Sequence, residues 1–180
     1  MINLQKQQLR KKVKVLKATF SFEQKNVKSD NIFRQMEHDL AFLKAKVVFA
    51  YWSMPDEVNT HAFIKKYSAT KTILLPVVAG DNLLLRKFNR MDQMKEEGKY
   101  GILEPQGDEF TDFHLIDYII VPGVAFDKYN NRMGRGKAYY DKLLKDLKAK
   151  KVGVCFDFQF FDNVPIDQYD IGMDTVIIDK

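Results

Sequence analysis

The chain has 180 residues, of which 46% are hydrophobic and 29% charged, and it carries a formal net charge of +5. A chain of this length and apolar content can bury roughly 70% of its unfolded surface, which excludes a disordered protein and predicts one domain over residues 1–180. Its longest apolar run, residues 119–126, falls well short of the roughly 20 residues that cross a bilayer.

The first half of the chain alternates patterns typical of helices and strands. Leu9, Val13 and Leu16 follow helical spacing and predict a cationic helix at the start. Ser29 or Asp30 can cap a second helix, and the β-branched run after that helix indicates a buried strand. The expected elements are helices over residues 2–17, 29–43 and 56–67 and strands over residues 46–51, 72–77 and 82–88.

The second half continues with strands and one further helix. Residues 89–114 lack clear periodicity and are expected to be loops. We then expect strands over residues 115–121, 151–156 and 174–178, with a glycine-containing loop and a helix over residues 137–150 between the first two. This order favours an α/β fold, a single three-layer domain with a mainly parallel sheet and helices on both faces.

The positive charge is concentrated in two segments. Residues 1–17 hold six cations and no acid, and residues 128–151 hold nine cations and two acids. Such segments suit a nucleic acid, because neutralising phosphates releases counterions, and they equally suit an enzyme that binds a polyphosphate. Charge alone leaves both classes open.

Three of the nine glycines, Gly123, Gly134 and Gly136, fall within fourteen residues between an expected strand and an expected helix. Open α/β sheets bind ligands at such places, and the amides of a helix start attract anions. The segment is not a P-loop, which needs glycine at Asn131, nor a dinucleotide fingerprint, which needs glycine at Tyr139. With a strand before it and a helix after it, an anion site is expected rather than an ordinary surface turn.

Residues 121–141 closely resemble the signature of the 5-formyltetrahydrofolate cyclo-ligase (methenyltetrahydrofolate synthetase) family. The matching residues are Pro-Gly-x-Ala-Phe-Asp from Pro122 and Asn-Arg-Met-Gly-Arg-Gly-Lys-Ala-Tyr-Tyr-Asp ending at Asp141. Shorter elements of the same family follow the same order along essentially the whole chain. They are Lys6-x-x-x-Arg10, the turn at residues 52–57, Ile-Leu-Glu-Pro at residues 102–105 and Met-Asp-Thr-Val at residues 173–176.

The resemblance implies an ATP-dependent cyclisation, with ATP as co-substrate and Mg²⁺ as the metal. ATP would phosphorylate the formyl oxygen of 5-formyltetrahydrofolate, and the neighbouring amine would close onto the activated carbon. Phosphate would then leave, giving 5,10-methenyltetrahydrofolate and ADP. We therefore expect a monomer that binds small molecules, a reduced folate and ATP, and neither a nucleic acid nor a membrane.

The resemblance also implies roles around the phosphates. Arg132, Arg135 and Lys137 would neutralise transition-state charge and are the expected catalytic residues. Lys6 and Arg10 would share one helical face and reach the same phosphate chain, unless that face is merely solvated. The other expected ATP contacts are Met133, Gly134, Gly136, Ala138, Tyr139 and Tyr140.

On the folate side, Glu57 would accept hydrogen bonds from pterin N–H groups, and Trp52 would form an apolar wall. Without the resemblance, the same residues could be a helix-start acid and a core aromatic. The remaining expected substrate contacts are Glu104, Arg135 and Tyr139.

Asp141 and Asp174 would hold Mg²⁺, which prefers one or two carboxylates together with phosphate oxygens and water. The alternatives are a helical ion pair for Asp141 and a strand-end turn for Asp174. The chain departs from the family pattern at Asn130 and Ala138, where glycine is common. Asn tolerates a left-handed turn, whereas Ala138 would keep the backbone slightly farther from a ligand.

Two other classes of protein stay open: a nucleic-acid-binding module, and a related α/β enzyme acting on sugar phosphates or acyl carriers. The second leaves Glu57 unexplained. The three histidines are scattered, so no zinc site is expected. The single cysteine, Cys155, lies in an apolar run and is expected to be a core residue, and the absence of a second cysteine favours a reducing, cytoplasmic location.

Overall fold

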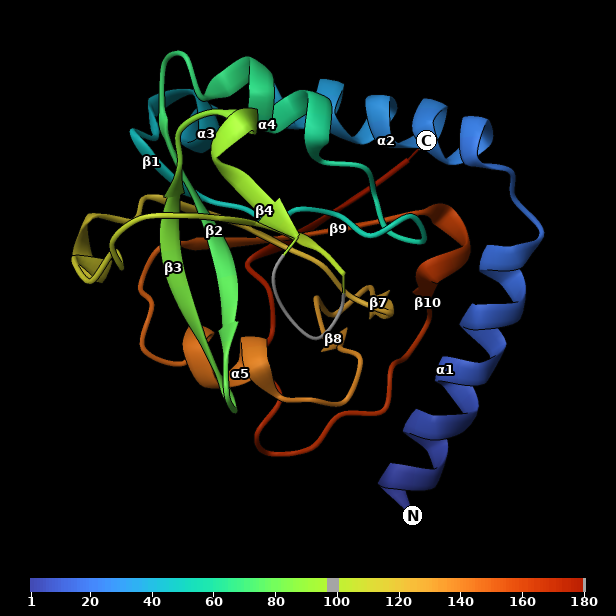
Figure 1. Cartoon of the computed structure of the whole chain (residues 1–180). Coiled ribbons are helices and arrows are strands. Elements are labelled where there is room, and N and C mark those ends of the chain that lie inside the picture. Colours follow the sequence, from blue (N-terminus) through green and yellow to red (C-terminus); the bar gives the residue numbers. More distant parts are fainter. Residues whose placement is uncertain (97–100, 180) are drawn as a thin grey trace.

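A six-stranded sheet lies at the centre of the computed structural model, which describes residues 1–96 and 101–179 (Figure 1). Its strand order is β11-β9-β6-β1-β2-β3, and neighbours pair in parallel except for the antiparallel hairpin β2–β3. The expected α/β fold with a mainly parallel sheet is confirmed. The strands are β1 (Val47–Phe49), β2 (Thr72–Ala79), β3 (Asn82–Phe88), β6 (Tyr118–Val121), β9 (Lys150–Cys155) and β11 (Thr175–Ile178).

The middle strands β1 and β6 consist of apolar residues because the sheet is covered on both faces. Val48 pairs with Tyr118 and Phe49 with Ile119, and all four residues are fully buried. Continuous apolar strands of this kind are typical of parallel sheets. Since β1, β2 and β6 run in the same direction, their carboxyl ends meet at one edge of the sheet.

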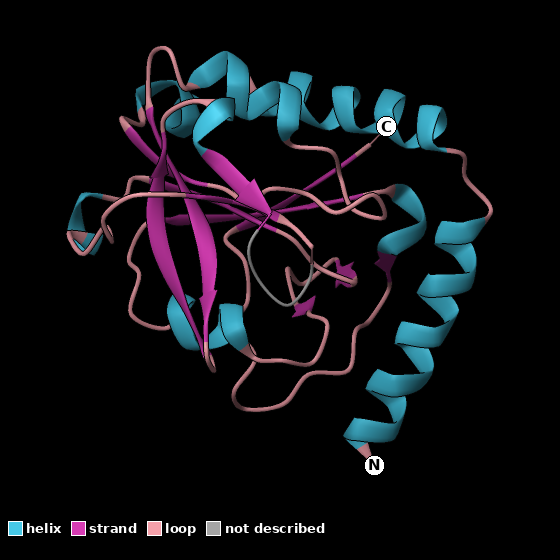
Figure 2. Ribbon diagram, in the orientation of Figure 1, coloured by secondary structure: helices cyan, strands magenta, loops and turns pink. Residues whose placement is uncertain are grey.

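Helices pack on both faces of this sheet (Figure 2). Phe33, Phe42 and Ile64 of α2, α3 and α4 share one core with the sheet. On the other face, Leu144 of α5 packs with Phe49. The helices are α1 (Ile2–Ala18), α2 (Phe22–Met36), α3 (Leu40–Lys44), α4 (His61–Tyr67) and α5 (Tyr139–Leu144). None of the helices in the described ranges is both long and apolar enough to cross a bilayer.

Two small sheets occupy segments that were expected to be loops. The three-stranded sheet β10-β7-β8 fills the region around the glycine-containing loop, and α1 packs on it through Val13. A two-stranded sheet and 3₁₀ turns break up residues 89–114, of which residues 97–100 lie outside the described ranges. These elements are β4 (Met94–Glu96), β5 (Leu103–Pro105), β7 (Ala125–Asp127), β8 (Arg132–Met133) and β10 (Phe160–Phe161), with 3₁₀ turns η1 (Met91–Gln93), η2 (Phe113–Leu115) and η3 (Asp157–Gln159).

The predicted helix over residues 29–43 is wrong at its start and is two helices. Ser21 caps α2 in a capping box with Gln24, so the helix begins seven residues earlier than expected. Ser29 lies inside α2, where its hydroxyl donates to the Lys25 carbonyl oxygen at 2.7 Å. Helix α2 ends at Met36, and Asp39 caps the separate helix α3.

Two more helices are shorter than predicted. The helix expected from residue 56 begins only at His61, because Thr60 and Ser53 hold the preceding residues in a loop with mutual side-chain to backbone bonds of 3.2 Å. The helix expected over residues 137–150 ends at Leu144, and Lys150 already belongs to β9.

Candidate active site

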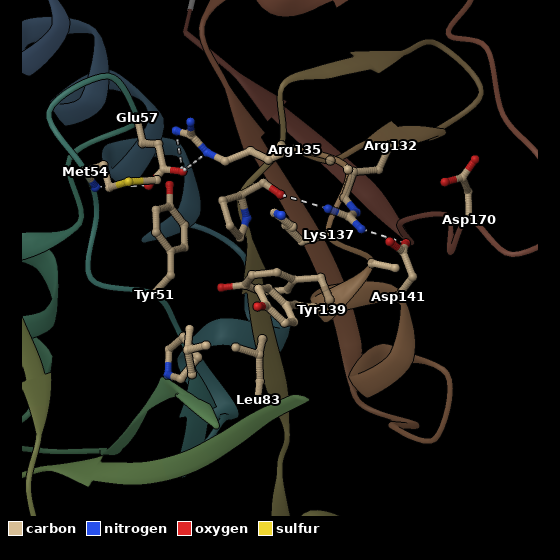
Figure 3. Close-up of a pocket in the computed structure, with 18 of the residues that line it drawn as sticks. Tyr51, Met54, Glu57, Leu83, Arg132, Arg135, Lys137, Tyr139, Asp141 and Asp170 are labelled. Carbon is tan, nitrogen blue, oxygen red and sulfur yellow. Dashed lines mark hydrogen bonds and ion pairs between the residues drawn. The ribbon is translucent and has the colours of Figure 1, made fainter. Parts of the chain in front are cut away.

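A cavity of about 630 Å³ opens at the carboxyl ends of β1 and β6 (Figure 3). Tyr51 and Trp52 follow β1 into its wall, and Pro122 and Gly123 follow β6. This is the position that open parallel sheets use for ligands. The cavity brings together fourteen of the predicted site residues: Lys6, Arg10, Trp52, Glu57, Glu104, Arg132, Gly134, Arg135, Gly136, Lys137, Ala138, Tyr139, Tyr140 and Asp141.

Arg132 is the most enclosed cation of the cavity. Its side chain is 3% exposed, its Nη2 donates to Asp141 Oδ1 at 2.6 Å, and its Nη1 donates to the Pro122 carbonyl oxygen at 3.3 Å. The Nε atom is buried without a hydrogen-bond partner among the described residues. A buried N–H normally has a partner, so this one is an exception among the described residues.

The two glycines of the loop lie close to arginine side chains. A Cβ at Gly134 would lie 3.0 Å from Arg132 Nη1, and a Cβ at Gly136 would lie 3.3 Å from Arg10 Cζ. Gly136 also has a φ of +93°, which side chains rarely adopt. Arg10 Nε donates to the Gly134 carbonyl oxygen at 3.0 Å, so α1 braces the loop. Lys137 lies exposed at its far end.

Arg135 crosses the cavity to a pair of acids. Its Nη2 lies 2.7 Å from Asp56 Oδ1. The same nitrogen lies 3.0 Å from Glu57 Oε1, and Nε donates to that Glu57 oxygen at 3.2 Å (Figure 3). Burial alone would lower the pKa of Arg135, but the charges of Glu57 and Asp56 outweigh it and raise that pKa. Asp56 also binds Lys17 Nζ at 3.1 Å, so four charges form one network.

Glu57 is positioned by the loop between β1 and α4. Its Oε2 accepts from the Met54 backbone N–H at 3.0 Å, while Oε1 faces Arg135. Trp52, from the same loop, stacks on His61 with ring centroids 3.9 Å apart and forms part of the cavity wall. The carboxylate and the aromatic wall expected for one ligand therefore lie in the same cavity.

Lys6, an expected phosphate contact, lines the cavity and is paired with two acids. Its Nζ is bound to Asp167 at 2.7 Å and to Asp170, and the lysine is 6% exposed. Burial would lower the pKa of Lys6, but the two carboxylates raise it overall. The charge of this lysine is thus already compensated within the protein.

Sequence reasoning missed Asp167 and Asp170, which line the cavity together with Tyr169. Residues 162–172 are rich in Asp, Pro and Gly and follow a strand, which is the signal that could have marked them as a loop at the site. The sequence likewise places Asp56 in a turn and does not predict its ion pairs with Arg135 and Lys17.

The remaining lining residues occupy the apolar side. Tyr140 stacks on Phe49 at 6.0 Å, and burial raises its pKa well above the usual value. Tyr139 donates to the Gly80 carbonyl oxygen at 3.3 Å, and Glu104 Oε1 accepts from the Val78 N–H at 3.3 Å. Tyr139 and Glu104 are thus partly committed to fixing the β2–β3 hairpin and β5 around the cavity.

Two predicted residues do not line the cavity. Met133 is fully buried in the core beneath α1, because it alternates with Arg132 along β8. Asp174 precedes β11, and its carboxylate accepts from the Lys151 N–H at 2.7 Å. The described residues contain no cluster of three metal-ligating side chains. Of the two expected Mg²⁺ ligands only Asp141 lines the cavity, which fits the ion with phosphate oxygens and water as further ligands.

Asn130 and Ala138, the two departures from the family pattern, have φ angles of 62° and 55°. They are the only non-glycine residues of the described ranges with positive φ. The left-handed region costs an L residue roughly 1–2 kcal/mol. The expected left-handed turn at Asn130 is confirmed, and Ala138 carries a strain that glycine would relieve.

Ala138→Gly is therefore expected to raise the free energy of unfolding by about 1 kcal/mol, measured by urea denaturation. The matched control is Ala41→Gly in α3, where right-handed helix makes glycine unfavourable by about 0.5–1 kcal/mol. Opposite signs for the two variants are expected. A loss of stability at both residues would contradict the strain assigned to Ala138.

The sequence profile of the 5-formyltetrahydrofolate cyclo-ligase family matches residues 2–179. The chain is 26% identical to 5-formyltetrahydrofolate cyclo-ligase of Haemophilus influenzae over 98% of this chain and 100% of that one. It is 32% identical to the probable 5-formyltetrahydrofolate cyclo-ligase of Schizosaccharomyces pombe over 83% and 82%. The NMR structure of Aquifex aeolicus 5,10-methenyltetrahydrofolate synthetase superposes with a TM-score of 0.87 at 35% identity, covering 97% of this chain and 90% of that one. This chain therefore belongs to the 5-formyltetrahydrofolate cyclo-ligase family, a family of ligase enzymes.

Proposed function

We propose that this protein, as a single three-layer domain, converts 5-formyltetrahydrofolate and ATP to 5,10-methenyltetrahydrofolate, ADP and phosphate. The observation that carries the proposal is the contact between Arg135 and Glu57 inside one cavity. It places a cationic, glycine-containing loop directly against a carboxylate suited to a pterin. Family membership supplies the substrate class.

The reaction needs little chemistry from the protein itself. The formyl oxygen attacks the γ-phosphorus of ATP, and ADP leaves. The N10 amine then attacks the activated formyl carbon and loses its proton to the departing phosphate or to solvent, and the C–O bond breaks to release phosphate. Because the nucleophiles belong to the substrate, catalysis consists of holding the reactants in line and neutralising charge.

Arg132, Arg135 and Lys137 would supply that neutralisation. Arg132 lines the cavity and is held by Asp141 and by the Pro122 carbonyl oxygen, so its guanidinium would be preorganised for an anion. Arg135 is half exposed and can exchange its carboxylate partners for phosphate oxygens. Arg10 would hold the loop through the Gly134 carbonyl oxygen and leave its other donors for phosphate.

Glu57 would bind the pterin through two charge-assisted hydrogen bonds once Arg135 moves to the phosphates. Trp52 would cover one face of the ring system. Val78, Leu83 and Ile102 give the cavity an apolar side for the aromatic part of the folate.

Mg²⁺ would be held by Asp141 together with the phosphate oxygens of ATP, and it would neutralise their charge. Asp141 already accepts from Arg132 and from the Ile171 N–H at 3.2 Å, both through Oδ1. The other oxygen, Oδ2, is the atom that would face the ion.

The proposal predicts that purified protein forms the methenyl product, followed by its absorbance, only with 5-formyltetrahydrofolate and Mg-ATP together. One ADP should appear for each product molecule. Chelating the metal with EDTA should abolish turnover, and added Mg²⁺ should restore it. Folded protein that forms no product with both substrates present would disprove the proposed function.

A further inference from the structure

Asp127, the last residue of β7, is a fully buried carboxylate that does not line the cavity. Its Oδ1 accepts from the backbone N–H groups of Tyr129 and Asn131 at 2.9 and 3.0 Å. Its Oδ2 accepts from Asn131 Nδ2 at 3.0 Å and from the Val164 N–H at 2.9 Å. Four N–H donors compensate the buried charge, and they come from two separate segments of the chain.

The first segment leads directly to the catalytic loop, residues 132–137, which carries Arg132, Arg135 and Lys137. The carboxylate closes the tight turn over residues 127–131, in which Asn130 has a positive φ. The Asp127 N–H also donates to the Asn131 carbonyl oxygen at 3.2 Å. Arg132 follows at once, so the direction in which its side chain enters the cavity depends on this turn.

The second segment leads to the N-terminal helix. From Val164 the chain reaches Asp167, whose N–H donates to Asp170 Oδ2 at 2.7 Å. Asp167 and Asp170 together bind Lys6 of α1. One turn further along α1, Arg10 donates to the backbone of the catalytic loop.

Two chains of contacts, or routes, therefore start at the Asp127 carboxylate. One runs through the turn at residues 127–131 and the other through Val164 and α1, and both end on the loop of residues 132–137. One route fixes the loop where it begins, at Arg132. The other fixes it two residues later, at the Gly134 carbonyl oxygen that Arg10 contacts. A shift of either route relative to the other would separate Arg10 from Arg132.

We propose that Asp127 is a positioning residue. It keeps the phosphate-binding cations of α1 and those of the 132–137 loop at fixed positions relative to each other. It acts through Val164 and the Lys6 ion pairs, and it does not touch substrate. The inference rests on the proposed function for its kinetic consequence, whereas its structural consequence can be measured without any ligand.

Asp127→Asn separates the two routes because asparagine keeps one acceptor oxygen. That oxygen can retain the N–H groups of Tyr129 and Asn131. The new amide can donate to the Asn131 side-chain oxygen after that side chain flips. The Val164 N–H then faces the new NH₂ group and loses its acceptor. The variant therefore removes the contact that leads to α1 and keeps those of the turn.

The experiment compares Asp127→Asn with Asp179→Asn, a control that changes a buried carboxylate away from the cavity. Asp179 accepts from the Asp157 N–H at 2.6 Å and from Lys28 Nζ at 2.6 Å. We expect Asp127→Asn to raise the KM for ATP about tenfold and lower kcat about tenfold, since small misplacements carry such costs. The folate KM should stay within about twofold, and the control should leave all three constants within about twofold.

Hydrogen exchange provides the readout that is independent of activity. In Asp127→Asn the amides of Val164, Asp167 and Asp170 should exchange faster than in the unchanged protein, while those of β9 should not. If the unchanged protein makes no product, the proposed function fails, and this exchange pattern still decides the role of Asp127.

Unchanged exchange at Val164, or an ATP KM within twofold of normal in folded Asp127→Asn, would overturn the proposal. Should that variant fail to fold, Asn131→Ala removes only one of the four donors. It should then raise the ATP KM about two- to fivefold without changing the folate KM. Equal constants for that variant would overturn the proposal as well.

Discussion

Arg135→Ala is expected to lower kcat by at least about a thousandfold, the effect typical of an arginine that neutralises charge in phosphoryl transfer. The side chain is 46% exposed, and its ion pairs within the described ranges are with Asp56 and Glu57, so its loss should change stability little. The protein should remain folded, and the lost activity would then report on the transition state. Single-turnover formation of the methenyl product measures this step directly.

Two variants make the result specific to the guanidinium at this position. Arg135→Lys keeps the charge but not the planar pair of donors, so it should recover only part of the rate. Arg90→Ala removes another exposed arginine paired to an acid, Asp92, outside the cavity, and should leave kcat unchanged. Near-normal turnover by Arg135→Ala would show that the phosphates are held elsewhere.

The pairing of Arg135 with Glu57 also couples the two substrates. Glu57 Oε1 already accepts hydrogen bonds from Arg135, so it cannot accept equally strong ones from a pterin N–H at the same time. A nucleotide that draws Arg135 to its phosphates frees this oxygen, so each substrate should bind more tightly when the other is present. In Arg135→Ala the carboxylate is free from the start, and this mutual effect should be lost.

The sheet and the anion-binding loop could be predicted from sequence because their signals are local. β1 and β6 are short runs of apolar residues, and Gly134 and Gly136 stand between a strand and a helix. The true start of α2 differs from the expected one because Ser21 and Gln24 form a capping box, with Ser21 eight residues before Ser29. Here the cap decides where the helix begins, and the stripe shows only that a helix exists.

The ion pairs of the site could not be predicted because they join residues far apart in sequence. Lys6 meets Asp167 and Asp170 across more than 160 residues, so its spacing from Arg10 suggested a shared phosphate contact. In the structure Lys6 pairs with these two acids and Arg10 donates to the loop, and the phosphate contact of Lys6 stays a prediction. Asp174 similarly had a matching motif, yet its carboxylate is bound to the Lys151 backbone and does not line the cavity.

Glu57→Ala is expected to raise the KM for 5-formyltetrahydrofolate about 10- to 100-fold, because hydrogen bonds to a charged group contribute roughly 1.5–3 kcal/mol. The KM for ATP should change much less, since Glu57 faces the phosphates only through Arg135. Initial rates with each substrate varied in turn separate the two constants.

Asp56→Asn tests whether Glu57 acts on folate or only holds Arg135. Both acids contact the same Arg135 nitrogen, at 2.7 and 3.0 Å, but only Glu57 lines the cavity. If Glu57 served merely to orient Arg135, the two variants would lower kcat alike and leave the folate KM unchanged. A rise in folate KM confined to Glu57→Ala assigns the carboxylate to the pterin, because both acids hold Arg135 and only Glu57 lines the cavity.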